Sequence, residues 1–173
     1  MSFSLFEATV PNYLQTLNAT AGLIAKAEAW CAEHSQPAET LIQAQLAPDM
    51  WPFARQITST AWHSQGAIQG AKAGVFTPDP QPVPEDFAGL KAKIAAAIAA
   101  LEAVSKAEVD SLLGQPVCFE IGQYRMDFIT EDFFMSFSMP NFHFHAATAY
   151  GILRSNNLPI GKMDFLGKVR KLG

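Results

Sequence analysis

Apolar residues recur every three to four positions through most of this chain, which is the spacing that buries one face of a helix. The pattern predicts four long helices, at about residues 4–34, 49–73, 85–113 and 130–154. The residues expected on the four buried faces are, in chain order, Phe6, Val10, Leu14, Leu17, Ala21, Ile24 and Cys31; Phe53, Ile57, Thr60, Ser64, Ala67 and Ala71; Leu90, Ile94, Ile98, Leu101 and Val104; and Phe134, Ser138, Asn141, His145, Thr148 and Ile152. This pattern favours an all-α fold in which each helix contributes one face to a shared core.

Residues at the helix ends support these boundaries. Ser4 and Glu7 have the spacing of a capping box, in which each side chain satisfies a free backbone N–H of the first turn. Thr130 is placed to cap the last helix, and Gly74 is placed to end the second. Pro140 falls well inside the last helix, where we expect a kink because proline removes one helical hydrogen bond and crowds the preceding turn.

Between the third and fourth predicted helices, the apolar period changes to two. Large apolar residues occupy every second position in 117–121 and again in 124–128, and Gly122-Gln123 lies between the two runs. Glycine at the first position suits a two-residue hairpin turn. The sequence therefore predicts a short β-hairpin, which must pack on the helices or on a partner chain because an isolated hairpin is only marginally stable.

Composition limits the class of protein. The chain has 173 residues, of which 49% are apolar, and a net charge of −4. This suits a single domain over residues 1–173, with the proline-rich stretch 77–84 as an extended connection inside it. Nucleic acid is excluded as an expected partner because its phosphates call for a basic surface.

The same sequence offers no feature of a membrane or secreted protein. It lacks a run of ~18 apolar residues, so no membrane partner is expected. The first residues have neither the basic start nor the unbroken apolar run of a signal peptide. Cys31 and Cys118 match no metal-binding or redox spacing, so we expect buried thiols in a cytoplasmic protein.

Two histidines and an asparagine form the candidate site. Asn141 and His145 are four residues apart and share one face of the last helix, and His63 lies beside the buried face of the second helix. Facing helices can bring His63 and His145 together, and bundle cores often hold metal sites. Neutral imidazole suits zinc, nickel or iron, but a catalytic zinc usually has three protein ligands. An amide such as that of Asn141 is a poor zinc ligand.

Two interpretations of His63, Asn141 and His145 therefore remain. They are a divalent-metal site or a buried hydrogen-bonded network, in which the amide and the imidazoles satisfy each other or a trapped water. We favour the network because one ligand is missing. His143 is not a candidate, since two residues of helix place it about 200° away from His145. No catalytic residue and no other cofactor ligand can be named from the sequence.

The last predicted helix is also rich in phenylalanine. Its members are Phe133, Phe134, Phe137, Phe142 and Phe144. A helix that is apolar on all sides is buried on all sides. Core packing accounts for part of the set, and we expect an interface between two copies of the chain to account for the rest. The sequence thus predicts a homodimer.

Several segments carry a resemblance to a known family. They are LAPDMWPFARQ (46–56), His63, NFHFHAATAYGILR (141–154) and LPIGKMDFLG (158–167), together with SLFEATVPNYLQTL (4–17) at the start of the chain. The motifs occur in the right order over nearly the whole sequence. The chain resembles the DinB/YfiT-like superfamily of four-helix bundles, and within it a bacterial branch known only as a domain of unknown function.

The resemblance implies an up-down-down-up bundle with a long connection between the second and third helices. In the wider superfamily, a divalent metal is held by one histidine of the second helix and a histidine pair four apart on the last. His63 matches the first of these and His145 the second member of the pair, whereas Asn141 occupies the position of the first member. Relatives with all the ligands include thiol transferases and hydrolase-like enzymes.

Two functions follow for this chain. The favoured one is a dimeric binding or structural protein with a degenerate metal site, for which a small molecule is a further expected ligand. The alternative is a divalent-metal-dependent enzyme, of the hydrolase or thiol transferase type, that uses His63 and His145. Asn141 is the feature that divides them, and the sequence alone leaves open whether the protein is an enzyme.

Overall fold

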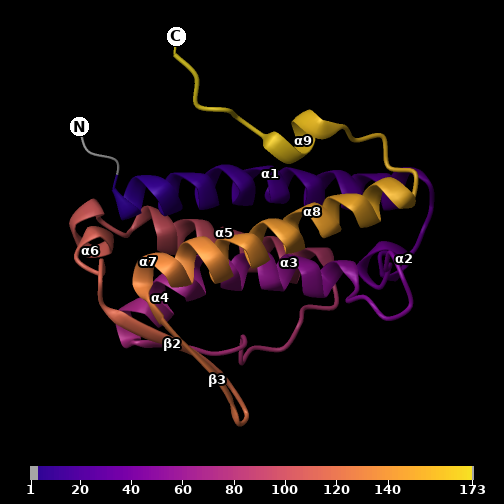
Figure 1. The fold of residues 1–173 in the computed structure, drawn as a ribbon. Helices are drawn as coiled ribbons and strands as arrows, with labels where there is room; N and C mark the ends of the chain where they lie inside the picture. Colours follow the sequence, from indigo (N-terminus) through magenta and orange to yellow (C-terminus); the bar gives the residue numbers. More distant parts are fainter. Residues whose placement is uncertain (1–3, 173) are drawn as a thin grey trace.

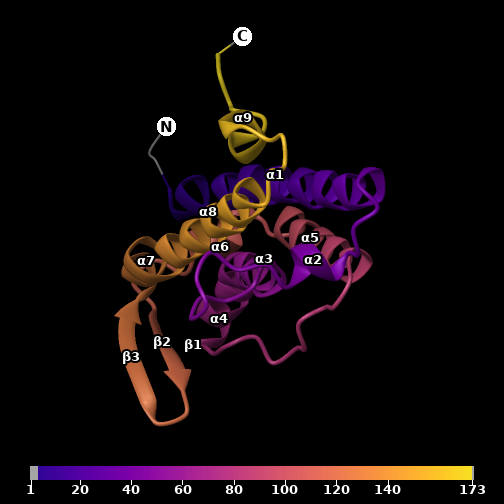
Figure 2. The same ribbon diagram turned by 90° about the vertical axis from the view of Figure 1, so that its right-hand side faces the viewer.

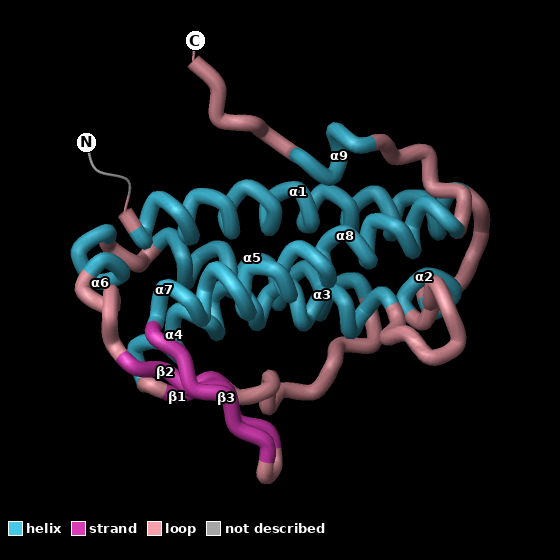
Figure 3. Tube along the Cα trace, in the orientation of Figure 1, coloured by secondary structure: helices cyan, strands magenta, loops and turns pink. Residues whose placement is uncertain are grey.

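Four helical rods lie side by side in the computed structural model, which describes residues 4–172 (Figures 1 and 2). Two of the rods are single helices, and two are joined from shorter pieces. The pieces are, in chain order, α1 (Leu5–Glu33); α3 (Phe53–Ala61), η1 (Trp62–Gly66) and α4 (Ala67–Ala73); α5 (Phe87–Glu102); and α7 (Thr130–Asp132), η2 (Phe133–Ser138) and α8 (Met139–Ser155). Short helices α2 (Glu39–Ile42), α6 (Lys106–Asp110) and α9 (Lys162–Leu166) cover the ends and one side of the bundle (Figure 3).

The rods pack as a bundle with a shared core. Helix α1 packs against α5 and α8, and α3 packs against α8 and α5. Figure 1 shows α1 and α8 running one way along the bundle and the second and third rods running the other way. Two consecutive rods in the same direction need a connection that returns along the bundle, and residues 77–84 lie in this connection. Within residues 4–172, no helix is both long enough and apolar enough to cross a membrane.

The predicted buried faces account for most of the core. Eighteen of their 24 members are buried. Five others pack against the core while partly exposed, namely Phe6, Leu14, Ala21, Ile98 and Val104, and Asn141 is partly exposed as well. The capping box of Ser4 and Glu7 is confirmed, and Gly74 ends α4 with a φ of 76°, a left-handed value that favours glycine. The predicted cap at Thr130 is wrong, because its hydroxyl donates instead to the carbonyl of Gln115 and Ile129 takes the cap position.

The predicted hairpin is confirmed, but it belongs to a larger sheet. Strands β2 (Pro116–Ile121) and β3 (Tyr124–Ile129) pair antiparallel around a turn in which Gly122 has a φ of 58°. Strand β1 (Val75–Phe76), directly after α4, adds to β2 in parallel. The fold is therefore mostly helical with a small sheet, and β1 is a strand between residues 4 and 172 that the sequence pattern did not predict.

The phenylalanines of the fourth rod divide between core and surface. Phe133, Phe134 and Phe142 are fully buried, and the ring of Phe137 packs in a tilted orientation against the rings of Phe119 and Phe133. Phe144 is 56% exposed. The prediction that this helix is buried on all sides is therefore wrong at Phe144, which faces away from the core.

The two rods that carry His63 and His145 each contain a π-helical segment, which no pattern in the sequence predicted. Segment η1 contains His63, and η2 ends just before Pro140, the second residue of α8. A proline in the first turn of an α-helix lacks only an N–H that would have no helical partner. The rod thus changes from π to α geometry where a kink was expected. Segments of this kind occur often at functional sites.

Candidate functional site

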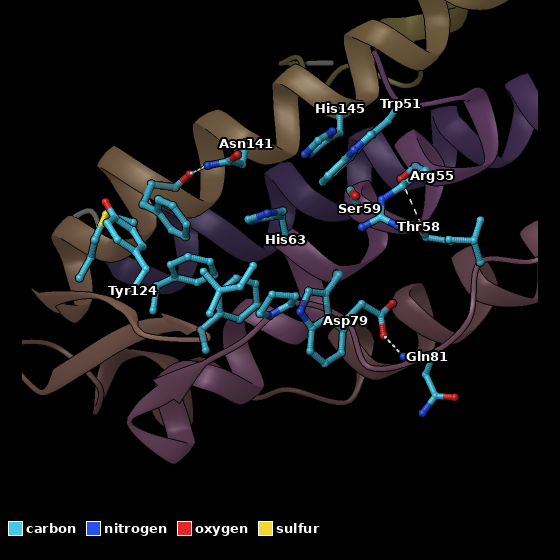
Figure 4. A pocket seen from close by; sticks show the side chains of 18 residues that line it. Trp51, Arg55, Thr58, Ser59, His63, Asp79, Gln81, Tyr124, Asn141 and His145 are labelled. Carbon is cyan, nitrogen blue, oxygen red and sulfur yellow. Dashed lines mark hydrogen bonds between the residues drawn. The ribbon is translucent and has the colours of Figure 1, made fainter. Parts of the chain in front are cut away.

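A cleft of about 440 Å³ lies between the hairpin, the 77–84 connection and the second and fourth rods. Its walls include all three residues of the predicted site, His63, Asn141 and His145 (Figure 4). The volume falls within the range of about 300–1,000 Å³ that is typical of small-molecule pockets. The candidate site is therefore a cleft with a size suited to a small organic ligand.

The imidazole of His145 is held by contacts on several sides. Its Nδ1 lies 2.7 Å from Oε1 of Gln56, and its ring stacks on that of Trp51 with centroids 5.5 Å apart and planes 7° from parallel. The amide nitrogen of Gln56 donates to the carbonyl of Trp51 at 3.0 Å. Since that nitrogen is already committed, the carboxamide oxygen faces His145, and Nδ1 must carry the proton. The Nε2 atom of His145 is left with a lone pair.

His63 lies between His145 and the aromatic cluster under the hairpin. Its ring is 5.7 Å from that of His145, with planes 25° apart, and it contacts Phe76 and Phe137. The hydroxyl of Ser138, the last residue of η2, donates to the backbone carbonyl of His63 at 2.7 Å. The two π-helical segments thus bind each other at the level of the site. The Nδ1 atom of His63 is buried and has no hydrogen-bond partner within residues 4–172.

Burial keeps both imidazoles neutral near pH 7. Desolvation, with a smaller contribution from the neighbouring His145, lowers the pKa of His63 to about 3. Desolvation lowers the pKa of His145 to about 4, with a contribution from the positive charge of Arg55. The two rings can therefore accept or donate hydrogen bonds in the cleft, but they supply no charge there.

Asn141 shares the cleft wall but points its amide nitrogen back to its own helix. The amide donates to the carbonyl of Phe137 at 2.7 Å, four residues earlier. Such a bond to a carbonyl one turn back is a common alternative for an asparagine side chain inside a helix. The predicted mutual hydrogen bond between Asn141 and the histidines is absent from the described residues, where His145 bonds to Gln56 instead.

These donors do not fit a resident metal ion with three protein ligands. Within residues 4–172, no three histidine, cysteine, aspartate or glutamate side chains lie together as a metal-binding group. The nearby carboxylates are engaged elsewhere, since Glu131 accepts from the backbone N–H of Gly114 and Asp127 pairs with Arg125. Two neutral imidazoles and an amide remain. A divalent ion here stays a prediction, with His63 and His145 as its available ligands.

The charged residues of the cleft wall are unevenly paired. Asp79, in the 77–84 connection, lies 2.6 Å from the ammonium of Lys93 on α5, and both side chains are mostly buried. Arg55 stacks its guanidinium 4.3 Å from the ring centre of Trp51. In the described part of the chain, no carboxylate lies within ion-pair distance of Arg55. The wall therefore carries one positive charge without a partner.

Several residues that line the cleft or support its wall were not predicted individually. Trp51, Arg55 and Gln56 all fall within the segment 46–56 that carries the family resemblance, so a motif marked them although no chemical pattern did. Asp79 and the hairpin side chains gave no such signal. His143 is exposed and outside the cleft wall, as its position on the helix predicted.

Comparison with known proteins agrees with this fold. Residues 5–166 match the family described as "Domain of unknown function (DUF1993)". No curated protein matches the sequence. Among solved structures, the chain is similar to a DinB family member protein from Shewanella denitrificans, with a TM-score of 0.83 and 23% sequence identity over 98% of this chain and 95% of the other. The resemblance to DinB-like bundles is confirmed, and at this identity it concerns the fold alone.

Proposed function

This chain belongs to the DUF1993 family, and on that premise we propose that it is a small-molecule-binding protein that acts as a homodimer and needs no metal. The cleft beside His63 and His145 is its binding site. The observation that carries the proposal is the cleft itself, a space of about 440 Å³ walled mainly by aromatic and apolar side chains with a few polar groups among them. Such a mixture is what binds and orients small organic molecules.

The position of a third metal ligand is occupied by Asn141, and its contacts support a small-molecule-binding protein over a metal enzyme. Asn141 places its amide nitrogen on the carbonyl of Phe137, and His145 is bound through Nδ1 to Gln56. Both imidazoles are neutral, so they suit hydrogen bonds to a ligand. The polar groups that a metal would gather are instead distributed along the wall of the cleft.

A filled-cleft variant tests the proposal. Ser59 lies on α3 and lines the cleft, so Ser59→Trp should occupy part of its volume. Ser136→Trp places the same ring on the exposed surface of η2 and is the matched control. A panel of small neutral, acidic and basic aromatic compounds would be screened by ligand-observed NMR. We expect hits that bind the wild type and Ser136→Trp but not Ser59→Trp. The absence of any such hit would overturn the proposal.

The homodimer is part of the same proposal. Support comes from apolar side chains at the exposed hairpin, where Ile121 is 50%, Tyr124 57% and Ile129 45% exposed. Strand β3 pairs only with β2 in the described sheet, so its other edge is open to a partner. Sedimentation equilibrium at micromolar concentration should give twice the chain mass. The variant Ile129→Glu, on the hairpin but outside the cleft wall, should give a monomer, and a monomeric wild type would refute the dimer.

A cytoplasmic location completes the proposal. Cys31 and Cys118 are both buried and free, which suits a reducing compartment. Alkylation of intact cells and of unfolded protein, compared by mass spectrometry, would show whether both thiols stay reduced.

One observation favours a second candidate, the divalent-metal-dependent hydrolase or thiol transferase. The Nδ1 atom of His63 is buried and has no hydrogen-bond partner in the part of the chain that the structure describes, as a metal ligand without its ion would be. Elemental analysis of protein purified without a histidine tag separates the candidates. Near-stoichiometric zinc, nickel or iron that is lost in His63→Ala and in His145→Ala would support the enzyme. Protein that takes up no metal even after incubation with divalent ions would exclude it.

A further inference from the structure

The wall of the cleft changes character from one end to the other. Residues contributed by α3 are polar, namely Arg55, Thr58 and Ser59, whereas those contributed by the hairpin are apolar or aromatic. Figure 4 shows Arg55 and Tyr124 at opposite ends with His63 between them. A ligand that satisfies both ends must be amphipathic, with a polar head at α3 and an apolar body along the hairpin.

The sign of the charge on the ligand's polar head follows from the charged residues of the cleft wall. Asp79 is neutralised by Lys93 at 2.6 Å, so it does not offer a free negative charge. Arg55 has no carboxylate within ion-pair distance between residues 4 and 172, and its charge reaches into the cleft far enough to affect His145. The two imidazoles are neutral and cannot hold an anion by charge. The cleft therefore has one uncompensated cation, and a ligand with a positive head would be repelled by it.

The number of negative charges on the ligand head also follows from the cleft wall. A guanidinium binds one carboxylate through two parallel hydrogen bonds and balances its charge. A phosphate monoester carries up to two charges near neutral pH, and the second would lie uncompensated in a partly desolvated cleft. Arg55 is held over Trp51 by a ring contact rather than an ion pair, so it can turn to a ligand without breaking a salt bridge.

Resting on the proposed function, we propose that the ligand class of this cleft is an organic monocarboxylate with an aromatic or apolar body, its carboxylate bound by Arg55 and its body packed on the hairpin. Ser59, one helical turn after Arg55, offers a hydroxyl to the same head group. The lone pair of His145 Nε2 accepts a hydroxyl or amide proton from the ligand body if it carries one.

Three probes that share one body and differ in the head test this inference. Phenylbutyrate, phenylbutyramide and phenylbutylamine carry negative, neutral and positive heads on the same chain, and isothermal titration gives their dissociation constants. We expect phenylbutyrate to bind at least about tenfold more tightly than phenylbutyramide, since a hydrogen-bonded charge pair contributes more than a neutral bond. Phenylbutylamine should bind most weakly. The preference should shrink as salt is raised.

Three variants test whether the preference for phenylbutyrate over phenylbutyramide arises in the cleft. Arg55→Gln should bring phenylbutyrate to the affinity of phenylbutyramide, while Lys162→Gln, which removes an exposed positive charge on α9, should leave the preference unchanged. Lys93→Met leaves the carboxylate of Asp79 without its partner and should weaken phenylbutyrate binding but not phenylbutyramide binding.

The outcomes separate the two proposals. Equal binding of the three probes, blocked by Ser59→Trp, would keep the small-molecule cleft and overturn the carboxylate inference. Tighter binding of phenylbutylamine would overturn it too. No binding of any probe to the wild type would count against both. A carboxylate preference that survives Arg55→Gln would remove Arg55 from the site.

Discussion

Gln56 holds His145 in one tautomer. The carboxamide oxygen accepts from Nδ1 at 2.7 Å, and its amide nitrogen donates to the carbonyl of Trp51 at 3.0 Å. A single buried side chain thus connects the histidine to the residue that stacks on it. A histidine ring held in this way presents a defined lone pair to the cleft.

Removing this carboxamide should destabilise the protein. Gln56→Leu keeps the volume but leaves Nδ1 of His145 and the Trp51 carbonyl without partners, at a cost of about 1–3 kcal/mol. Urea unfolding followed by circular dichroism measures the loss. Gln69→Leu, on the exposed face of α4, should change the free energy of unfolding by no more than about 0.5 kcal/mol. Equal stability of the two variants would show that the bonds of Gln56 contribute nothing.

The protein should lose stability in mild acid. In the unfolded chain both imidazoles titrate near 6.5, whereas folding lowers the pKa of His63 to about 3 and of His145 to about 4. Between these values the unfolded state binds more protons, so the free energy of unfolding falls as the pH drops from about 6.5 toward 4. The loss is on the order of 2–3 kcal/mol for His145.

Unfolding curves across that pH range check this prediction. His145→Gln should flatten the dependence between pH 6.5 and 4, relative to the wild type. The core variant Ile57→Val, which adds no titrating group, should lower the free energy of unfolding by a similar amount at every pH. A wild type whose stability is constant over this range would contradict the assignment of buried neutral rings.

Restoring the missing ligand should create a metal site. Asn141→His places an imidazole one helical turn before His145, beside His63, so three neutral nitrogens line the cleft. We expect stoichiometric zinc binding by isothermal titration, where the wild type binds little. Asn18→His, on the exposed side of α1, is the control for adventitious binding. Equal zinc binding by Asn141→His and Asn18→His would count against this geometry.

Two glycines should respond in opposite directions to alanine. A Cβ at Gly66 would lie 2.5 Å from the ring of Trp62, which donates to the carbonyl of Thr77 and lines the cleft. Gly66→Ala must therefore displace that ring, and we expect a loss of about 1–3 kcal/mol. Gly22, exposed on α1, has open space around it, so Gly22→Ala should gain about 0.5–1 kcal/mol. Thermal unfolding would show the melting temperature moving down in the first variant and up in the second.

The sequence was most informative where local rules govern the structure. Helical spacing identified the four rods, and the capping box at Ser4 and the turn at Gly122 were confirmed because each depends on a few neighbouring residues. Strand β1 was missed since two residues carry no period. The π-helical segments were missed because the choice between π and α hydrogen bonding depends on contacts with other helices, such as that of Ser138 with His63.

The candidate site was also predicted only in part from the sequence. The sequence by itself determined that His63 and His145 could face each other, because their positions on two amphipathic helices follow from spacing. Only the tertiary structure decided what surrounds them. Gln56 rather than Asn141 bonds to His145, Lys93 neutralises Asp79, and Arg55 has no carboxylate partner among the described residues. Burial, hydrogen bonds and charge pairing between distant segments depend on distances in space, and no period along the chain encodes those distances.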